Sequence, residues 1–148
     1  MSDQTTDIEL RAIFSETRTI AVVGFSANPA RPSHYVAEFL ARRGYRVIPV
    51  NPGLAGQEFL GTTVRASFSE ITEPVDMVDI FRRSEDIPPV VDEALRAFPG
   101  LSTVWMQLGL RNARAADAAR AAGVRVVEDR CPKIEIPRLF APGWQVEP

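Results

Sequence analysis

The residues TIAVVGF at positions 19–25 constrain the fold more than any other part of the chain. This run is almost entirely apolar and rich in β-branched residues, which is typical of a strand buried on both faces in a parallel sheet. Gly24 precedes a turn-rich loop from Ser26 to Ser33, and apolar residues at helical spacing then lead to a stop signal at Gly44. The sequence therefore predicts a strand, a loop and a helix in succession.

Strand and helix patterns continue to alternate along the rest of the chain. Further strands are predicted at residues 45–50, 75–81, 103–108 and 124–127, with a short extra strand near Phe59. Helices are predicted at residues 6–14, 36–43, 67–70, 84–98 and 112–122, and the tail at 133–140 is predicted as a short helix or an apolar strap. This alternation predicts an α/β fold, a Rossmann-like doubly wound sheet of about five parallel strands in three α/β/α layers.

One domain is expected for residues 1–148, with a leading helix within 1–18 and the core within 19–140. A length of 148 residues matches one ordinary domain, and a hydrophobic fraction of 45% suffices to cover a sheet on both faces. The chain has no run of about 18 uncharged apolar residues, and its amino terminus does not resemble a secretory signal. A cytoplasmic location is therefore expected.

Charge and residue counts exclude several classes of function. The formal net charge of −2 gives no general attraction to nucleic acid or to a membrane, so an anionic ligand must be held by a local group of arginines. One cysteine and one histidine exclude an internal disulfide framework and a structural zinc site, and no metal is expected. The expected partner is a small molecule, and the sequence leaves the oligomeric state open.

The ligand site is predicted outside the carboxyl ends of the strands, where doubly wound sheets bind their ligands. The first loop, GFSANPARPS, lacks both the glycine spacing of a dinucleotide site and the lysine motif of a nucleoside triphosphate loop. It offers the Ser26 hydroxyl, the Arg31 guanidinium and a helix start at Pro32 and Ser33, a set that suits a diphosphate. In the alternative interpretation, this is an ordinary turn in which Ser33 caps the helix.

The next two loops favour an adenine-containing phosphate ester other than NAD. The second strand ends in Asn51 and Pro52, whereas an NAD site would place an acidic residue there for the ribose. The third loop places a ring, two cations and a hydroxyl at the same edge: Phe81, Arg82, Arg83 and Ser84. In the alternative interpretation, the two arginines are solvated and the phenylalanine belongs to the core.

The last two loops contribute an amide and a thiol. Gln107 can hydrogen-bond a ligand and Gly109 allows close approach of the backbone, although either residue could equally serve the turn itself. Cys131 follows the fifth strand beside Arg130 and Lys133, where cations could lower a thiol pKa and where a ligand thiol could reach it. The alternative role for this cysteine is that of a small buried hydrophobic residue.

Several medium-length motifs occur in one order along the chain: VGFSANPARPS, VIPVNP, PVDMVDIFRRSEDIPP, VWMQLG and DRCPKIE. With these motifs the chain, from about Thr19 to Leu139, resembles the family of small bacterial and archaeal CoA-binding proteins. That family is similar to the CoA-binding domain of the succinyl-CoA synthetase alpha subunit. The resemblance implies a free-standing Rossmann-like domain with coenzyme A (CoA) as its ligand.

The resemblance also implies which residues contact CoA. It places five residues of the first loop around the diphosphate: Gly24, Phe25, Ser26, Arg31 and Ser33. It places residues of the following loops along the nucleotide and the pantetheine arm: Asn51, Pro52, Phe81, Arg82, Arg83, Ser84, Gln107 and Gly109.

Two further positions follow from the same resemblance. Family members often carry a cation after the asparagine–proline turn, whereas this chain has Gly53, so Arg82 or Arg83 is expected to compensate at the ribose 3′-phosphate. Cys131 matches the family's terminal arginine–cysteine motif, near the expected thiol end of the ligand. A mixed disulfide between Cys131 and CoA is therefore a hypothesis.

The favoured function is non-catalytic binding of CoA or acyl-CoA, as a carrier, sensor or regulator, because no catalytic constellation is recognisable. The chain is therefore not expected to be an enzyme. Two alternatives stay open: a protein that senses NAD, another nucleotide or thiol redox state, and an accessory part of an acyl-CoA ligase. The missing glycine motif and Asn51 oppose NAD. A ligase would also need a phosphorylatable histidine in a second domain and a nucleotide-grasp partner.

Overall fold

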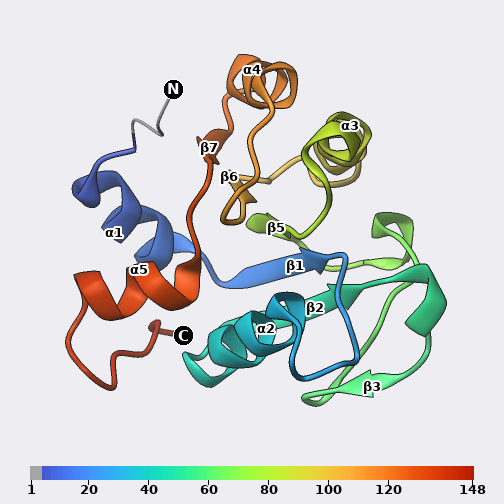
Figure 1. Ribbon diagram of the computed structural model, residues 1–148, viewed down its shortest axis with the longest axis horizontal. Coiled ribbons are helices and arrows are strands. Elements are labelled where there is room, and N and C mark those ends of the chain that lie inside the picture. The colour runs from blue at the N-terminus through green and yellow to red at the C-terminus, as the bar shows by residue number, and fades with distance from the viewer. Residues whose placement is uncertain (1–4) are drawn as a thin grey trace.

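A parallel sheet of five strands forms the centre of the structure, a computed structural model that describes residues 5–148 (Figure 1). The strands lie in the order β2, β1, β5, β6 and β7. Their bounds are Thr19–Val23 for β1, Arg46–Val50 for β2, Met77–Ile80 for β5, Thr103–Met106 for β6 and Arg125–Val127 for β7. The predicted parallel strands are confirmed. Residues 1–4 of the predicted leading segment lie outside the described residues.

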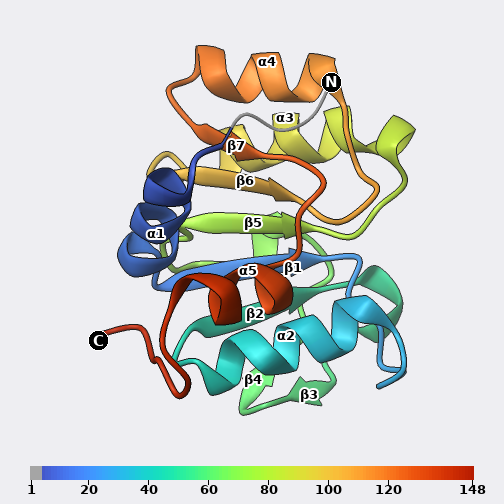
Figure 2. The same cartoon turned by 60° about the vertical axis from the view of Figure 1, so that its left-hand side comes forward.

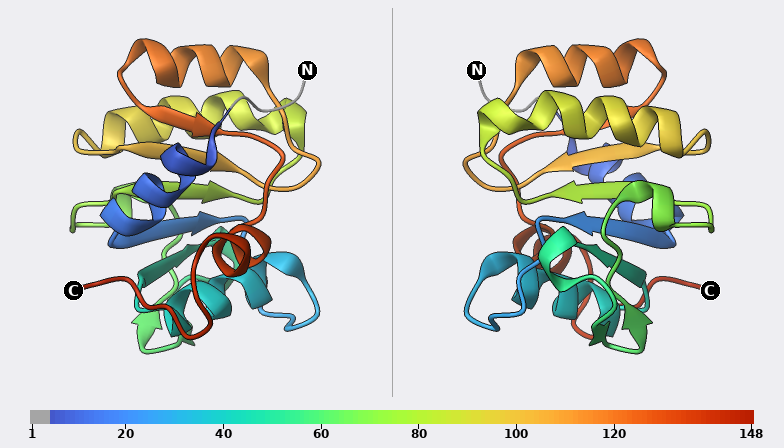
Figure 3. Two further views of the ribbon diagram at one scale, coloured as in Figure 1. Left: turned by 90° about the vertical axis from the view of Figure 1, so that its left-hand side faces the viewer. Right: turned by 90° about the vertical axis from the view of Figure 1, so that its right-hand side faces the viewer.

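Helices cover both faces of this sheet. One face carries α1 (Asp7–Glu16), α2 (Pro32–Arg42) and α5 (Pro132–Leu139), and the other carries α3 (Ile87–Ala97) and α4 (Ala113–Ala121) (Figure 3). Figure 2 shows the strands running in one direction between these layers. The predicted Rossmann-like, doubly wound arrangement is confirmed. None of the helices within residues 5–148 has both the length and the apolar character needed to cross a membrane.

Shorter elements form the connections. An antiparallel hairpin of β3 (Glu58–Phe59) and β4 (Thr62–Thr63) contains the extra strand predicted near Phe59. Within the described residues, the 3-10 helices are η1 (Pro52–Leu54), η2 (Phe68–Glu70) and η3 (Ser84–Asp86).

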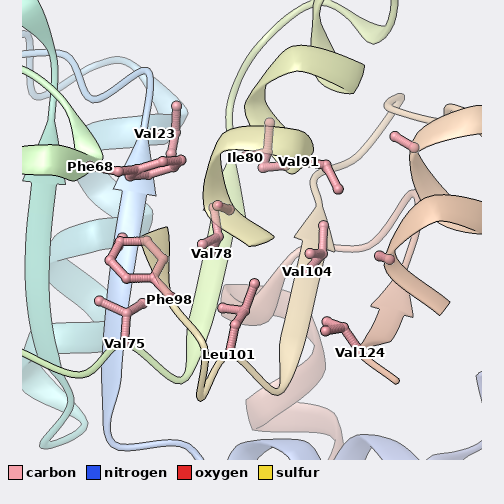
Figure 4. Packing of buried hydrophobic residues seen from close by; sticks show 14 of the residues in the cluster. Val23, Phe68, Val75, Val78, Ile80, Val91, Phe98, Leu101, Val104 and Val124 are labelled. Atoms are coloured by element: carbon pink, nitrogen blue, oxygen red, sulfur yellow. The ribbon is translucent and has the colours of Figure 1, made fainter. Parts of the chain in front are cut away.

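Two apolar cores lie on the two faces of the sheet, because alternate side chains of each strand point to opposite sides. Val23, Val78 and Val104 pack with Phe68 and Phe98 on the side of α3 and α4 (Figure 4). The opposite core contains the alternate strand residues and side chains from α1, α2 and α5: Leu10, Phe14, Ile20, Val22, Val36, Leu40, Met77, Trp105 and Ile136. Burial on both faces explains why the run at positions 19–25 is almost continuously apolar.

Capping side chains define two helix starts that the sequence predicts. Thr6 Oγ1 accepts the Glu9 N–H at 3.1 Å before α1. Asn112 Oδ1 accepts the Ala115 N–H at 2.9 Å before α4. Each bond satisfies a backbone donor that the first helical turn leaves free, which stabilises the helix start.

The segment at residues 67–70 and the tail at 133–140 both form helices. The short helix predicted at residues 67–70 forms as η2 with Ser67 at its N-cap position, although the Ser67 hydroxyl lies 2.7 Å from that of Ser69 and makes no capping bond. The tail, for which the sequence leaves a helix and an apolar strap open, folds as the helix α5 with Ile136 and Leu139 buried.

Candidate functional site

The carboxyl ends of β1 and β5 mark the point where the chain leaves the sheet in opposite directions. The loop after β1 leads to α2 on one face, and the loop after the neighbouring β5 leads to α3 on the other (Figure 1). Open α/β sheets bind ligands at such a switch point. The two backbones meet there: Gly24 has φ +84°, and a Cβ at this position would lie 2.1 Å from the Phe81 carbonyl oxygen. This close approach therefore requires glycine.

A cavity of about 700 Å³, here called the larger cavity, opens at this edge and is in the size range of small-molecule sites. It lies between the start of α2, the loops after β5 and β6, and the start of α5. Its lining is mainly apolar, with an amide, a thiol and charged groups: Pro32, Tyr35, Val36, Phe81, Arg82, Arg83, Asp86, Gln107, Leu108, Leu110 and Cys131. Residues predicted from four separate loops therefore meet in one space.

A second cavity of about 230 Å³, here called the smaller cavity, lies at the ends of β1 and β2 and beside α3. Its lining is Val23, Gly24, Val50, Asn51, Pro52, Ala66, Ser67, Phe68, Arg82, Val90 and Glu93. The predicted residues Gly24, Asn51 and Pro52 therefore share this cavity. Arg82 lines both cavities, so the two spaces adjoin at this residue.

Arg82 and Arg83 are adjacent in sequence but have different surroundings. Arg83 Nε donates to Asp86 Oδ2 at 3.1 Å and lies 3.4 Å from Glu85 Oε1, and these carboxylates raise the pKa of the Arg83 guanidinium. The Arg82 guanidinium forms no hydrogen bond or ion pair with any residue from 5 to 148. Arg82 is therefore available to a ligand anion, whereas the charge of Arg83 is already balanced.

The start of α2 excludes the alternative in which Ser33 caps the helix. The N-cap residue is Arg31, in an extended conformation, and Pro32 occupies the first turn. Ser33 is therefore inside the helix, with only 5% of its surface exposed. The Arg31 side chain is exposed and has no partner in the described part of the chain. An anion at the start of this helix would meet both the free amides and this guanidinium.

Other predicted residues hold the loops in place. Asn51 Nδ2 donates to the Phe25 carbonyl oxygen at 2.6 Å, and Asn51 Oδ1 accepts the Gly53 N–H at 2.8 Å. The first bond joins the loops after β1 and β2, and the second holds the turn after β2. The Phe25 ring is buried and stacks on His34 with 5.4 Å between centroids, while His34 Nδ1 lies 2.9 Å from the Ser26 carbonyl oxygen. Neither Phe25 nor Ser26 lines either of the two cavities.

Ser84 and Gly109 stabilise the loops after β5 and β6. The Ser84 hydroxyl accepts the Arg111 N–H at 3.2 Å, and the Ser84 carbonyl oxygen accepts from Asn112 Nδ2 at 2.9 Å. The Gly109 N–H donates to Asp129 Oδ1 at 2.7 Å, and this bond, together with Arg111, lowers the pKa of Asp129. Both residues lie outside the lining of the two cavities and contribute to the loop geometry that surrounds them.

Cys131 lies at the N-cap position of α5 and lines the larger cavity. Only 6% of its surface is exposed, so it is a buried residue that also borders the ligand space. The neighbouring Arg130 is paired with Glu135 at 3.1 Å. Lys133 Nζ lies 5.8 Å from the centroid of the Tyr35 ring, which is part of the same cavity.

Asp79 is a site residue that the motif patterns do not indicate. It is fully buried in β5, and burial raises the pKa of its carboxyl group well above the ordinary value. The Gln107 amide faces it, and when the amide is oriented with Nε2 toward Asp79, Nε2 donates to the two carboxyl oxygens at 2.9 and 3.3 Å. The sequence signal for Asp79 is a single carboxyl group within the apolar run MVDIF. Carboxyl groups are rarely buried unless they have a hydrogen-bond partner.

Comparison with known proteins identifies the family. The sequence model of the family described as CoA binding domain matches residues 18–137. The chain belongs to the CoA binding domain family. The resemblance drawn from the motifs between Thr19 and Leu139 is therefore confirmed. A relative in Bacillus subtilis (strain 168), the uncharacterized protein YneT, is 39% identical over 126 residues, which cover 85% of this chain and 90% of the relative.

Solved structures show the same fold in free-standing and in longer chains. The cell-free ID.343 protein of Thermus thermophilus has a TM-score of 0.86 and 42% identity, and the match covers 92% of this chain and all 100% of that one. The dinucleotide forming acetyl-coenzyme A synthetase 1 of Ca. Korarchaeum cryptofilum has a TM-score of 0.64 and 24% identity over 79% of this chain but 26% of its own. The second likeness concerns the fold alone.

Proposed function

We propose that this member of the CoA binding domain family binds CoA or acyl-CoA across the two cavities at the carboxyl edge of the sheet. The observation that carries the proposal is the position of Arg82, which has no partner within residues 5–148 and lines both cavities. An unpaired arginine beside two adjoining spaces suits a ligand whose diphosphate joins two different parts. CoA has this form, with 3′-phosphoadenosine on one side of the diphosphate and the pantetheine arm on the other.

The linings of the cavities match these two parts. The smaller cavity offers the Phe68 ring, Val50 and Pro52 to a flat base. The larger cavity offers aromatic and aliphatic walls to the arm, including Tyr35 and Leu110. Under this proposal the nucleotide occupies the smaller cavity, and the arm crosses the larger one toward Cys131. Arg31 contacts the diphosphate from the start of α2.

The proposed role is non-catalytic: a carrier, sensor or regulator. The chain has one histidine and one cysteine. His34 contacts the Ser26 carbonyl oxygen and packs against the rings of Phe25 and Phe59, with centroids 5.4 and 4.9 Å away, so it is not paired with the Cys131 thiol as a general base. A single thiol without a disulfide partner also suits the reducing cytoplasm, which is the location we propose.

Calorimetric titration tests the proposal. Purified protein is titrated separately with CoA, acetyl-CoA, NAD and ATP at one fixed ionic strength. We expect saturable binding of CoA and acetyl-CoA that is at least about tenfold tighter than binding of NAD or ATP, because only the first two carry the arm. Equal affinity for all four ligands would favour nucleotide sensing instead, and no binding of CoA would refute the proposal.

A further inference from the structure

Asp79 carries a buried carboxyl group in a part of the sheet that is otherwise apolar. It is 0% exposed, and its neighbours in register are Val22 on β1 and Trp105 on β6. No ion pair joins it to a cation within residues 5–148, and burial raises its pKa well above the ordinary value. Burying such a group is unfavourable unless it is hydrogen-bonded, so its partner is informative.

That partner is the side-chain amide of Gln107. Oriented with Nε2 toward Asp79, the amide donates to Oδ1 at 2.9 Å and to Oδ2 at 3.3 Å. Gln107 is itself only 6% exposed and lines the larger cavity. An amide carries one donor group and one acceptor oxygen. With Nε2 committed to Asp79, Oε1 is the group that Gln107 has left to offer a ligand.

We propose that Asp79 is a positioning residue, which holds one half of the Gln107 amide so that the other half faces the ligand. An amide without such a partner can turn over freely, whereas a hydrogen bond to Asp79 fixes which group points into the larger cavity. The inference rests on the proposed function, in which the larger cavity holds the pantetheine arm. That arm carries amide N–H and C=O groups, so it offers a partner to the group that Gln107 presents.

The neutral acid form of Asp79 is sufficient for this role. Its raised pKa favours the protonated form, which keeps a carbonyl oxygen that can accept from Nε2 and adds an O–H that can donate to Oε1. Asparagine places a carbonyl oxygen at the same position, whereas valine places none. Asp79→Asn therefore retains the positioning contact, and Asp79→Val removes it while placing a residue that suits a buried strand.

Two ligands separate positioning from a general structural effect. CoA reaches the larger cavity, whereas adenosine 3′,5′-bisphosphate has no arm to place there. In calorimetric titrations, Asp79→Val should weaken CoA binding on the order of 3- to 10-fold, the loss of one neutral hydrogen bond, with little change for the bisphosphate. Asp79→Asn should bind both ligands like the wild type. Equal losses for both ligands, or equal losses in the two variants, would overturn the proposal.

A double variant tests whether Asp79 acts through Gln107. Gln107→Leu removes the contact directly, so it should weaken CoA binding at least as much as Asp79→Val, and combining the two should cause no further loss. An additive loss contradicts the proposal. If Asp79→Val does not fold, Asp79→Ala is measured in its place, because alanine is smaller than aspartate and cannot overpack the core. If the wild-type protein does not bind CoA, the proposed function is refuted. If the wild-type protein binds CoA and the variants bind it with the same affinity, only the role of Asp79 is refuted.

Discussion

The backbone of Gly24 touches that of Phe81, since a Cβ on Gly24 would lie 2.1 Å from the Phe81 carbonyl oxygen. This contact joins the ends of β1 and β5 at the point where their loops diverge. Phe81 lines the larger cavity and Gly24 lines the smaller one, so this backbone contact lies between the two cavities. The stability of the fold and the shape of the site therefore depend on the same pair of residues.

Gly24→Ala is expected to destabilise the protein strongly. The added methyl group must displace the Phe81 backbone and also forces a non-glycine residue into the left-handed region, for a cost of about 2 to 4 kcal/mol. Gly123→Ala is the matched control, because Gly123 has φ +81° but no heavy atom near its would-be Cβ. Its cost should stay near 1 kcal/mol. Urea unfolding of both variants measures the difference, and equal losses would show that the contact with Phe81 is unimportant.

Arg82→Ala is expected to weaken CoA binding by about 1.5 to 3 kcal/mol, the usual contribution of a charged hydrogen bond. The reason is that the Arg82 guanidinium borders both cavities and is free of ion pairs among residues 5–148. Calorimetry at low and high salt measures the loss. The loss should shrink as salt rises, because salt screens the contact between the guanidinium and the phosphate.

Arg83→Ala is the matched control for this charge effect. It removes the same charge one residue away, but this guanidinium is bound to Asp86 and Glu85. Binding of CoA should change by less than about 0.5 kcal/mol, as for most exposed ion pairs. A larger loss in Arg83→Ala than in Arg82→Ala would mean that the ion pairs of Arg83 open on binding and that our assignment of Arg82 is wrong.

The sheet, its helices and the edge that carries the two cavities could be predicted because they follow from local patterns. The apolar run at 19–25 predicts β1 through burial on both faces, and Asn112 predicts the start of α4 through its cap. The short helix predicted at residues 67–70 forms only one turn, η2, in which the Ser67 hydroxyl contacts Ser69 instead of capping the helix. A capping pattern indicates where a helix can begin and does not determine its length.

The partners of the charged groups could not be predicted, because they depend on how distant loops meet. Arg82 and Arg83 look equivalent in the sequence, and only the turn η3 brings Asp86 to one of them. Asp79 stands out as a carboxyl group in an apolar strand, but its contact with Gln107 requires that β5 and β6 be neighbours. The strands and helices around the site therefore follow from local sequence patterns, whereas the partners of its charged groups depend on the tertiary structure.

Cys131 is expected to react with CoA disulfide. The Cys131 thiolate attacks one sulfur of the disulfide, a bond between protein and CoA forms, and the second CoA leaves as the thiol after taking up a proton. The cysteine borders the larger cavity, where the proposed arm ends. Intact mass should rise by one CoA adduct in the wild type, while Cys131→Ser should stay unmodified. Saturating acetyl-CoA should slow the reaction, and labelling that ignores acetyl-CoA would place the reactive thiol outside the ligand site.

Asp79 should also make the stability of the fold depend on pH. Its folded-state pKa is raised above the ordinary value of 3.8, so the folded state keeps a proton that the unfolded state has already lost. The stabilisation that protonated Asp79 contributes is therefore complete at pH values below the pKa of its carboxyl group in the unfolded state. It decreases as the pH rises toward the pKa of that group in the folded state. The slope approaches that of one proton, about 1.4 kcal/mol per pH unit. Asp79→Asn carries no titrating proton and serves as the reference.

Urea unfolding of the wild type and of Asp79→Asn between pH 4.5 and 8, roughly the window above the ordinary aspartate pKa, isolates this effect. Subtracting the two stabilities at each pH cancels the other carboxyl groups, including Asp7 and Glu73, whose pKa values are lowered by Arg138 and Arg46 and whose contribution runs in the opposite direction. The wild type should lose stability relative to Asp79→Asn as pH rises. A difference that stays constant with pH would mean that Asp79 is ionised in the fold, and Gln107 would then be donating to a carboxylate rather than to a neutral acid.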